Sequence, residues 1–309
     1  MSANPRLPNA DMPESGITAC PLCRSNELVR VDTYKREWRL CSRCGAGHPA
    51  QKRTYPLSFI PHPTFRRRVD ATEGSMYDYF VHPSHIEYSI GTAHEFLRDY
   101  VDPLHIDLRS KKILDVSGGN GHFLKVLTQR GAVGVLTEIN KPSIDYARKE
   151  HGFETFQFDF NRDRLSALTA DEFDVVLLRA AIMFCRDLPG FIADARQRIR
   201  ASGLVVVNHS VKPTLGVLCR VQLDEFSYMV LRQPETVIGD FEAAGFELVF
   251  RRDETDQSDY VYDHDLVNSW MLLHYLYEIK GALALRKHRM FGFPARDRRR
   301  STMIFRKKA

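Results

Sequence analysis

The sequence has no long hydrophobic run. No stretch of its 309 residues approaches the roughly 18 apolar residues that a bilayer-spanning helix needs. The most apolar helical candidate, residues 266–289, is interrupted by Asn268, Glu278 and Lys280. Residues 1–16 are polar and proline-rich, without an apolar segment of signal-peptide length. These absences predict a soluble, cytoplasmic protein with no membrane partner, whose first 16 residues form a disordered tail.

A strong excess of one charge is also missing. The formal net charge is +5, and 27% of the residues are charged. Basic residues gather at residues 296–309, whereas nucleic-acid-binding domains often carry a bias over a whole face. The sequence shows no internal repeat and no low-complexity tract. The composition therefore permits RNA or an anionic substrate and requires neither.

Cysteines are few, yet four of the six form two C-x2-C pairs, 20-CPLC-23 and 41-CSRC-44, with seventeen residues between them. This is the spacing of a zinc site, because two residues between cysteines let both thiolates face one ion. Gly45 suits the tight turn that follows such a pair. The pattern predicts a zinc ribbon over residues 17–50, held by Cys20, Cys23, Cys41 and Cys44, with two short strands within residues 27–40.

The competing interpretation of these cysteines is a pair of disulfides, but no secretion signal indicates an oxidising compartment. Four thiolates close the zinc shell and leave no position for a substrate, so the predicted zinc is structural. His48 is not needed as a ligand, and Cys185 and Cys219 are expected in the core.

Beyond the ribbon, residues 51–75 are rich in proline and basic residues and predict an extended linker. A helix is expected over residues 84–100, with Ser84 as its N-cap. Apolar strands and helices then alternate, which indicates an α/β fold with a doubly wound parallel sheet covered on both faces. The expected strands are 112–116, 133–139, 155–160, 173–180, 203–210, 246–252 and 302–307, and the expected helices are 121–130, one beginning near Pro142, 188–200 and 234–244.

The first of these strands leads into a glycine-rich loop, in 113-ILDVSGGNGHFLKVL-127. Such a loop lets a ligand approach the backbone and directs the N–H groups of the following helix toward it. Glu138 stands at the end of the second strand, seventeen positions after Gly121, where a carboxylate can accept hydrogen bonds from a ribose diol. The two features predict a nucleoside-containing cofactor, for which NAD is one candidate.

The details resemble class I S-adenosylmethionine-dependent methyltransferases. The loop is similar to their D-x-G-x-G-x-G motif, and 138-EINKPSIDYAR-148, 158-FDF-160 and the run 173–207 resemble further segments of that family. The last strand, after a long insertion, matches its antiparallel edge hairpin. The resemblance covers most of residues 76–309 and implies a seven-stranded Rossmann-like sheet.

The resemblance also implies a cofactor site. Asp115, Gly119 and Gly121 would flank the methionine part of S-adenosylmethionine, Glu138 the ribose, and Asp159 with Phe160 the adenine. Each has a simpler interpretation: Asp115 as a helix cap, for example, and Phe160 as a core residue. The full predicted set is Asp115, Ser117, Gly118, Gly119, Gly121, Glu138, Asp159, Phe160 and Tyr79, and Tyr77 beside Tyr79 is a second aromatic that would cover the cofactor.

Ser117 departs from the family pattern, which has its first glycine there. If φ is positive at this position, serine is strained by about 1 kcal/mol. Gly118 could absorb part of the turn, and the Ser117 hydroxyl could contact the methionine carboxylate. The loop is therefore predicted to bind the cofactor.

Methyl transfer from a sulfonium is an in-line displacement that needs a base only if the acceptor must lose a proton. Many relatives carry a Glu-His pair after the fourth strand, where this chain has Met183 and Phe184. The candidate bases are His209, at the end of the fifth strand, and then His82 and His85. His209 is preferred because the carboxyl ends of the strands face the ligand.

Two segments, residues 211–233 and 255–300, are expected as lids over this edge of the sheet. Three functions stay open. The first is methylation of a small molecule of the sugar or natural-product type. The second is methylation of RNA. The ribbon is weakly basic and poor in aromatic residues that could stack on bases, which argues against this function. The third is a non-enzymatic protein with a degenerate cofactor site. The methyl acceptor and the oligomeric state are not encoded in any recognisable pattern.

Overall fold

The computed structural model describes residues 18–20, 23–32, 36–43, 47–52, 81, 83–211, 232, 234–255 and 299–308. The chain divides into two compact units. One comprises residues 1–73, 210–237 and 253–301, and the other comprises residues 74–209, 238–252 and 302–309. Among the described helices, none is long and apolar enough to cross a membrane.

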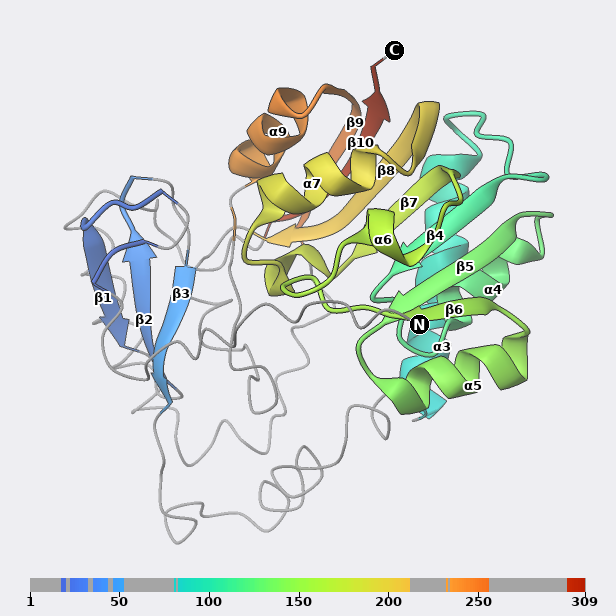
Figure 1. The fold of residues 1–309 in the computed structure, drawn as a ribbon, viewed down its shortest axis with the longest axis horizontal. Coiled ribbons are helices and arrows are strands. Elements are labelled where there is room, and N and C mark those ends of the chain that lie inside the picture. Colours follow the sequence, from blue (N-terminus) through green and yellow to red (C-terminus); the bar gives the residue numbers. More distant parts are fainter. Residues whose placement is uncertain are drawn as a thin grey trace, which may run out of the picture. The chain divides into compact units, whose positions relative to one another are not determined.

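A seven-stranded sheet has the order β6-β5-β4-β7-β8-β10-β9 (Figure 1). The chain starts in the middle, at β4, builds outward to β6, and then returns to the other side of β4 with β7. This reversal is a topological switch point, beyond whose carboxyl ends ligands bind in such sheets. The strands are β4 (Lys112–Val116), β5 (Val133–Glu138), β6 (Glu154–Gln157), β7 (Phe173–Arg179), β8 (Ile199–Val211), β9 (Phe246–Thr255) and β10 (Arg299–Lys307).

The pairs β4–β5, β4–β7, β5–β6 and β7–β8 are parallel. β10 runs the other way. Lys307 near its end donates to the carbonyl of Ile199 at the start of β8, whereas Thr302 near its start meets Asn208 near the end of β8. The sheet is thus mostly parallel with an antiparallel final strand, as the sequence predicts, and β9 is the outermost strand.

Helices cover both faces of this sheet. In Figure 1, α6, α7 and α9 lie in front of the strands, while α3 and α4 lie behind them. The described helical segments are α3 (Pro83–Phe96) with a π-helical continuation (Leu97–Val101), α4 (His122–Thr128), α5 (Lys141–His151), α6 (Leu165–Leu168), a 3-10 turn (Ile182–Phe184), α7 (Leu188–Arg196) and α9 (Pro234–Ala243).

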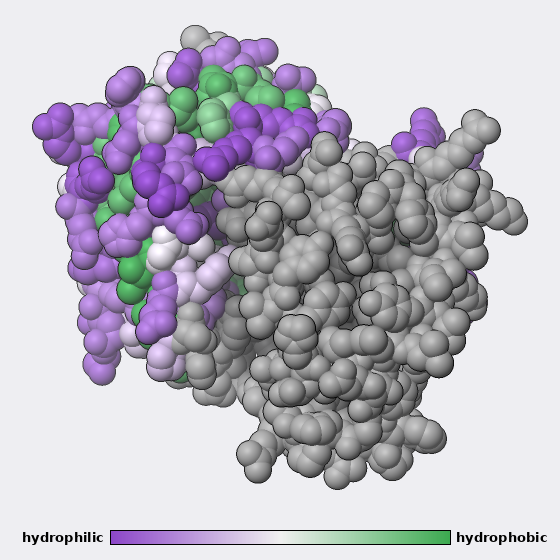
Figure 2. Space-filling view, turned by 180° about the vertical axis from the view of Figure 1, so that it is seen from behind, coloured by the Kyte–Doolittle hydropathy of each residue, from purple (hydrophilic) through white to green (hydrophobic). Residues whose placement is uncertain are grey.

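Successive side chains of a strand point to opposite faces of the sheet, and each face has its own buried core. Ile113 of β4 and Leu177 of β7 pack with Phe96 of α3 and Leu124 of α4 in one buried cluster. On the α9 side, Phe241 stacks on Phe305 of β10 with ring centroids 4.1 Å apart. Figure 2 shows the fold from behind, where hydrophilic residues cover much of the described surface and hydrophobic ones lie in bands between them.

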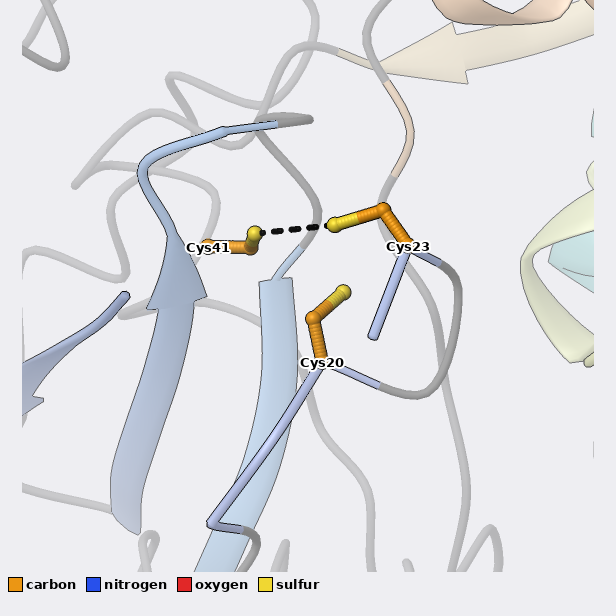
Figure 3. A group of neighbouring side chains, drawn as sticks. All are labelled: Cys20, Cys23 and Cys41. Carbon is orange, nitrogen blue, oxygen red and sulfur yellow. Dashed lines mark hydrogen bonds between the residues drawn. The ribbon is translucent and has the colours of Figure 1, made fainter. Parts of the chain in front are cut away.

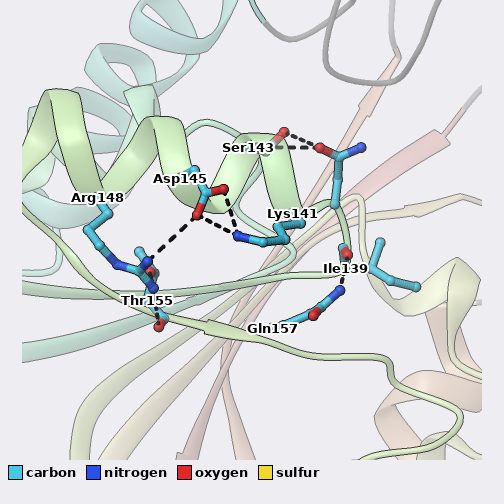
Figure 4. Close-up of polar contacts among 8 residues, drawn as sticks. Ile139, Lys141, Ser143, Asp145, Arg148, Thr155 and Gln157 are labelled. Carbon is cyan, nitrogen blue, oxygen red and sulfur yellow. Dashed lines mark hydrogen bonds and ion pairs between the residues drawn. The ribbon is translucent and has the colours of Figure 1, made fainter.

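The local sequence of helix α5 determines where the helix begins and ends (Figure 4). The Asn140 side chain caps the helix by accepting from the Ser143 N–H at 3.0 Å, and Pro142 occupies the first turn. Gly152 ends the helix with φ 72°, a conformation that glycine adopts easily. Arg148 donates to the Thr155 hydroxyl at 2.8 Å, which ties the helix to β6.

Several sequence-based boundaries are wrong, among them the following three. Ser84 does not cap α3, because the helix begins at Pro83 and Ser84 lies inside its first turn. The helix expected over 188–200 ends at Arg196, since β8 already begins at Ile199. The strand expected over 155–160 stops at Gln157, because Asp159 and the residues after it form a hydrogen-bonded turn.

The other unit contains an antiparallel three-stranded sheet. Its strands are β1 (Leu28–Asp32), β2 (Arg36–Cys41) and β3 (Gly47–Lys52). The first two correspond to the two short strands predicted within residues 27–40, with β2 ending one residue later. β3 was not foreseen, and it extends into the segment expected to be linker. The disordered tail, the rest of the linker and nearly all of both predicted lids lie outside the described residues, as do Cys44, Tyr77, Tyr79, His82 and Cys219.

Candidate functional site

The loop after β4 has the backbone of a ligand-binding turn. Positive φ angles occur at Ser117 (58°), Gly119 (58°) and Gly121 (81°). Ser117 therefore bears the strain that the sequence anticipates, about 1 kcal/mol. Gly118 does not take over the turn, because its φ is not positive. Its role is close approach: a Cβ there would lie 2.9 Å from Asp115 Oδ2.

Glu138, at the end of β5, is 5% exposed and accepts three backbone hydrogen bonds. Gly119 N–H donates to its Oε2 at 3.0 Å, and the N–H groups of Ile139 and Asn140 donate to its Oε1 at 2.7 and 3.1 Å. Burial raises the pKa of Glu138, while these donors work in the opposite direction. The carboxylate is thus fixed against the glycine loop.

Asp115 is fully buried in β4 and pairs with Arg179, the last residue of β7. Arg179 NH2 lies 3.0 Å from Asp115 Oδ2, and the guanidinium carbon lies 3.5 Å from the centre of the Phe123 ring. Burial raises the pKa of Asp115, and the guanidinium opposes that shift. Sequence reasoning missed Arg179. The sequence feature that could have indicated Arg179 is its position, as a charged residue at the end of an apolar strand that neighbours the strand carrying Asp115.

Unsatisfied polar atoms gather around this loop. Asn120 is 3% exposed, and neither its Oδ1 nor its Nδ2 has a hydrogen-bond partner. Asp115 Oδ1 and Arg179 Nε are also buried without partners. Buried side-chain polar atoms are usually paired, so these groups fit a site that a polar ligand completes.

The two residues expected at the adenine have local partners. Asp159 Oδ1 accepts from the Asn161 N–H at 2.9 Å, and its Oδ2 lies 3.5 Å from Arg162 Nε. The Phe160 ring packs against Phe191 with centroids 4.9 Å apart. Both residues follow the end of β6 and do not lie within the strand as predicted, and their contact with adenine stays a prediction.

Two histidines approach the loop from different helices. His85 of α3 lies 3.4 Å from the Ser89 hydroxyl through Nε2. Its pKa is lowered to about 4, first by burial and then by the nearby charges of His122 and Arg179. His122, the first residue of α4, also has a lowered pKa because of burial. Both imidazoles are therefore neutral near pH 7.

These shifts predict a pH-dependent stability. The unfolded chain takes up a proton at His85 near pH 6.5, whereas the folded chain does not until about pH 4, so lowering the pH across this window destabilises the fold. The raised pKa values of Asp115 and Glu138 act in the opposite sense, since the folded state protonates them more readily. Thermal unfolding of His85→Gln is expected to lose less stability over this window than the wild type. His94→Gln, exposed on the same helix, is the control for replacing a histidine; equal slopes for His85→Gln and the wild type would contradict the assignment.

Comparison with known proteins identifies the family to which this chain belongs. The model of a family described as "Methyltransferase domain" matches residues 89–250, just over half of the chain. The chain belongs to this methyltransferase-domain family. No curated protein sequence matches it.

A solved structure shares the fold of this methyltransferase. A protein described as a sarcosine dimethylglycine methyltransferase from Galdieria sulphuraria shares 13% identity with a TM-score of 0.51, over 71% of this chain and 86% of that one. An S-adenosylmethionine-dependent methyltransferase from Mesorhizobium loti shares 12% identity with a TM-score of 0.46, over 68% and 97%. The family match supports a methyltransferase, and the first of these two structures supports its Rossmann-like fold.

The methyltransferase also brings three of the four predicted zinc ligands together (Figure 3). The sulfur atoms of Cys20, Cys23 and Cys41 all lie within 4.8 Å of one another. Thiolates around one zinc ion lie about 3.8 Å apart, so the spacing fits a metal. Arg24 N–H donates to the Cys20 carbonyl at 2.9 Å, and φ is 59° at Arg24.

The preferred base, His209, lies near the end of β8, and its side chain is outside the described structure. Its backbone position follows from the register, because Asn208 is opposite Arg179 on β7. His209 is therefore one residue beyond the end of β7, at the carboxyl edge of the sheet. Met183 and Phe184 lie in the 3-10 turn after β7.

Proposed function

We propose that this protein transfers the methyl group of S-adenosylmethionine to a small-molecule acceptor of the sugar or natural-product type. The observation that carries the cofactor half of the proposal is Glu138, a buried carboxylate held by three backbone N–H groups against the glycine loop. The acceptor class is supported by the sequence, because the predicted ribbon is only weakly basic and has few aromatic residues for stacking on bases.

The residues present fit this cofactor. Glu138 would hold the ribose hydroxyls, Ser117 and Gly119 would line the methionine part, and Asp159 with Phe160 would contact the adenine. The unsatisfied buried atoms belong to Asp115, near the end of β4, and to Asn120 of the loop that follows it. S-adenosylmethionine supplies an already activated methyl group, so the protein's work is positioning, exclusion of water and, where the acceptor requires it, removal of a proton.

His209 is the proposed base for an acceptor that must lose its proton. It lies at the carboxyl end of β8, next to the end of β7. The glycine-rich loop after β4 lies at the same edge of the sheet. A second element of the proposal is a structural zinc ion held by Cys20, Cys23, Cys41 and Cys44, of which the first three are described and clustered.

Calorimetric titration with S-adenosylhomocysteine tests the cofactor assignment. The wild type is expected to bind it, and Glu138→Ala to bind about 100-fold more weakly, because two charge-assisted hydrogen bonds to the ribose are lost. Glu150→Ala removes an exposed carboxylate of α5 and is expected to bind normally. Folded wild-type protein that binds neither S-adenosylhomocysteine nor S-adenosylmethionine would overturn the proposal.

The acceptor class is tested with isotope-labelled S-adenosylmethionine. We expect label to enter a sugar, phenol or related small molecule in a metabolite panel, with little in RNA. Label that enters RNA, with binding that falls steeply as salt is added, would overturn the small-molecule assignment while leaving methyl transfer intact.

A further inference from the structure

We propose that His122 and His151 form a binding site for a divalent transition-metal ion, such as zinc, between helices α4 and α5. His122 is the first residue of α4, and His151 is the last residue of α5. The site is distinct from the cysteine cluster, which belongs to the other unit of the chain. It does not depend on the proposed methyl transfer, and its ligand is a metal ion and not a part of S-adenosylmethionine.

Three rings from the two helices meet at this site. The ring centroids of His122 and His151 are 4.9 Å apart, with an angle of 76° between the ring planes. The ring of Tyr146 in α5 lies 5.5 Å from the first imidazole and 5.7 Å from the second. Two imidazoles that bind one tetrahedral ion through nitrogen atoms about 2.0–2.1 Å away have centroids roughly 5 Å apart. The separation of the two imidazoles therefore matches that of two ligands of one ion.

The two Nε2 atoms carry the inference further than the distance does. Aromatic rings that simply pack together have centroids about 4.5–7 Å apart, so the distance alone also fits packing. However, Nε2 of His122 and Nε2 of His151 are both buried, and neither has a hydrogen-bond partner. The two nitrogen atoms are thus not bonded to each other either. Because buried polar atoms are usually paired, packing leaves them unexplained, whereas one ion would satisfy both.

The surroundings suit a metal that prefers nitrogen ligands. Burial lowers the pKa of both imidazoles, which keeps them in the neutral form that binds metals. The charges of Lys125 and Glu150 act on His151 in opposite directions. Among the described residues, no third histidine, cysteine or carboxylate joins the pair within 4.8 Å. Two imidazoles without excess negative charge favour zinc or nickel over magnesium or calcium, which prefer oxygen ligands.

An ion at this site would join the start of α4 to the end of α5. Each of the two imidazole rings is partly exposed, which gives the ion a route from solvent. With two protein ligands the ion exchanges readily and is washed out during purification, unlike an ion in a closed shell of four thiolates. Binding stabilises the folded chain, because the unfolded chain does not hold the two nitrogen atoms together. The concentration of free zinc would therefore set the stability of this helix pair.

Calorimetric titration of the full chain with zinc chloride tests the site. Elemental analysis first gives the metal content of the purified protein, so that only further ions are counted. The wild type is expected to bind one further ion, and magnesium chloride to give no binding. His122→Phe and His151→Phe keep a ring in place and remove the nitrogen, and each is expected to weaken this binding about 100-fold or more. His94→Phe, at an exposed histidine of α3, is the matched control and keeps the wild-type affinity.

Melting temperatures separate loss of the ion from loss of the fold. With zinc at about 100 times its dissociation constant, the wild type and His94→Phe are expected to melt about 5 °C higher, and the other two variants to show no such shift. Nuclear magnetic resonance of the wild type needs no variant, and zinc should shift the side-chain signals of two of the twelve histidines. Binding that survives in both His122→Phe and His151→Phe, or a wild type that takes up no further ion, would overturn the site and leave two packed rings.

Discussion

The purified protein is expected to contain one zinc ion per chain, and Cys20→Ser or Cys41→Ser to lose it. Both cysteines are fully buried, and their sulfur atoms share a cluster with that of Cys23. Zinc binding to such sites contributes about 10–16 kcal/mol of folding free energy. A three-stranded sheet of this size buries too little surface to fold without a metal or a cross-link. Loss of zinc should therefore unfold β1, β2 and β3 while the seven-stranded sheet persists.

Elemental analysis measures the zinc content, and limited proteolysis reports which unit has opened. Cys185→Ser is the matched control, since Cys185 is equally buried but follows the 3-10 turn after β7. It should keep one zinc ion per chain. A zinc-free protein that is fully folded and whose mass shows oxidised cysteines would favour the disulfide alternative. In the structure the sulfur atoms of Cys23 and Cys41 are 3.5 Å apart, well beyond the length of a disulfide bond. A disulfide between these two cysteines would therefore contradict the structure.

Gly121→Ala is expected to lower the free energy of unfolding by about 2–4 kcal/mol and to weaken S-adenosylhomocysteine binding. Two causes act together. The φ of 81° strains any residue with a Cβ, and that Cβ would lie 2.9 Å from Cε2 of the buried Phe153 ring. Phe153 belongs to the core cluster, so the ring cannot yield without disturbing its neighbours.

Gly152→Ala separates these causes. Gly152 has a similar φ of 72°, but a Cβ there meets nothing within 4 Å. Its expected loss is about 1 kcal/mol, from backbone strain alone. Urea unfolding followed by circular dichroism measures both variants. Equal losses would mean that packing against Phe153 contributes nothing at Gly121.

Much of the seven-stranded sheet could be predicted from sequence because its strands are buried on both faces and read as continuous apolar runs. β4 and its loop, β5 ending in Glu138, and β7 all lie where these runs place them. The glycine-rich motif after β4 accounts for the positive φ at Gly119 and Gly121. Strain at Ser117 was expected on the condition that φ is positive there, and it is.

Other features depend on contacts distant in sequence. The Asp115–Arg179 pair joins residues 64 positions apart, and only the strand register shows that they meet. β3 has a polar sequence with a glycine and a proline, and it becomes a strand by pairing with β2. The start of α3 was misplaced because Ser84 is a favourable N-cap residue, yet Pro83 already occupies the first turn.

The position of β10 between β8 and β9 has a consequence for synthesis on the ribosome. β9 emerges first, but its neighbour in the sheet is β10, and residues 256–298 are made between them. Until residues 299–307 follow, β9 has no strand to pair with, and the open edge of β8 can bind another chain. The nascent protein is therefore most exposed to misassembly late in translation, when most of the sheet has already formed.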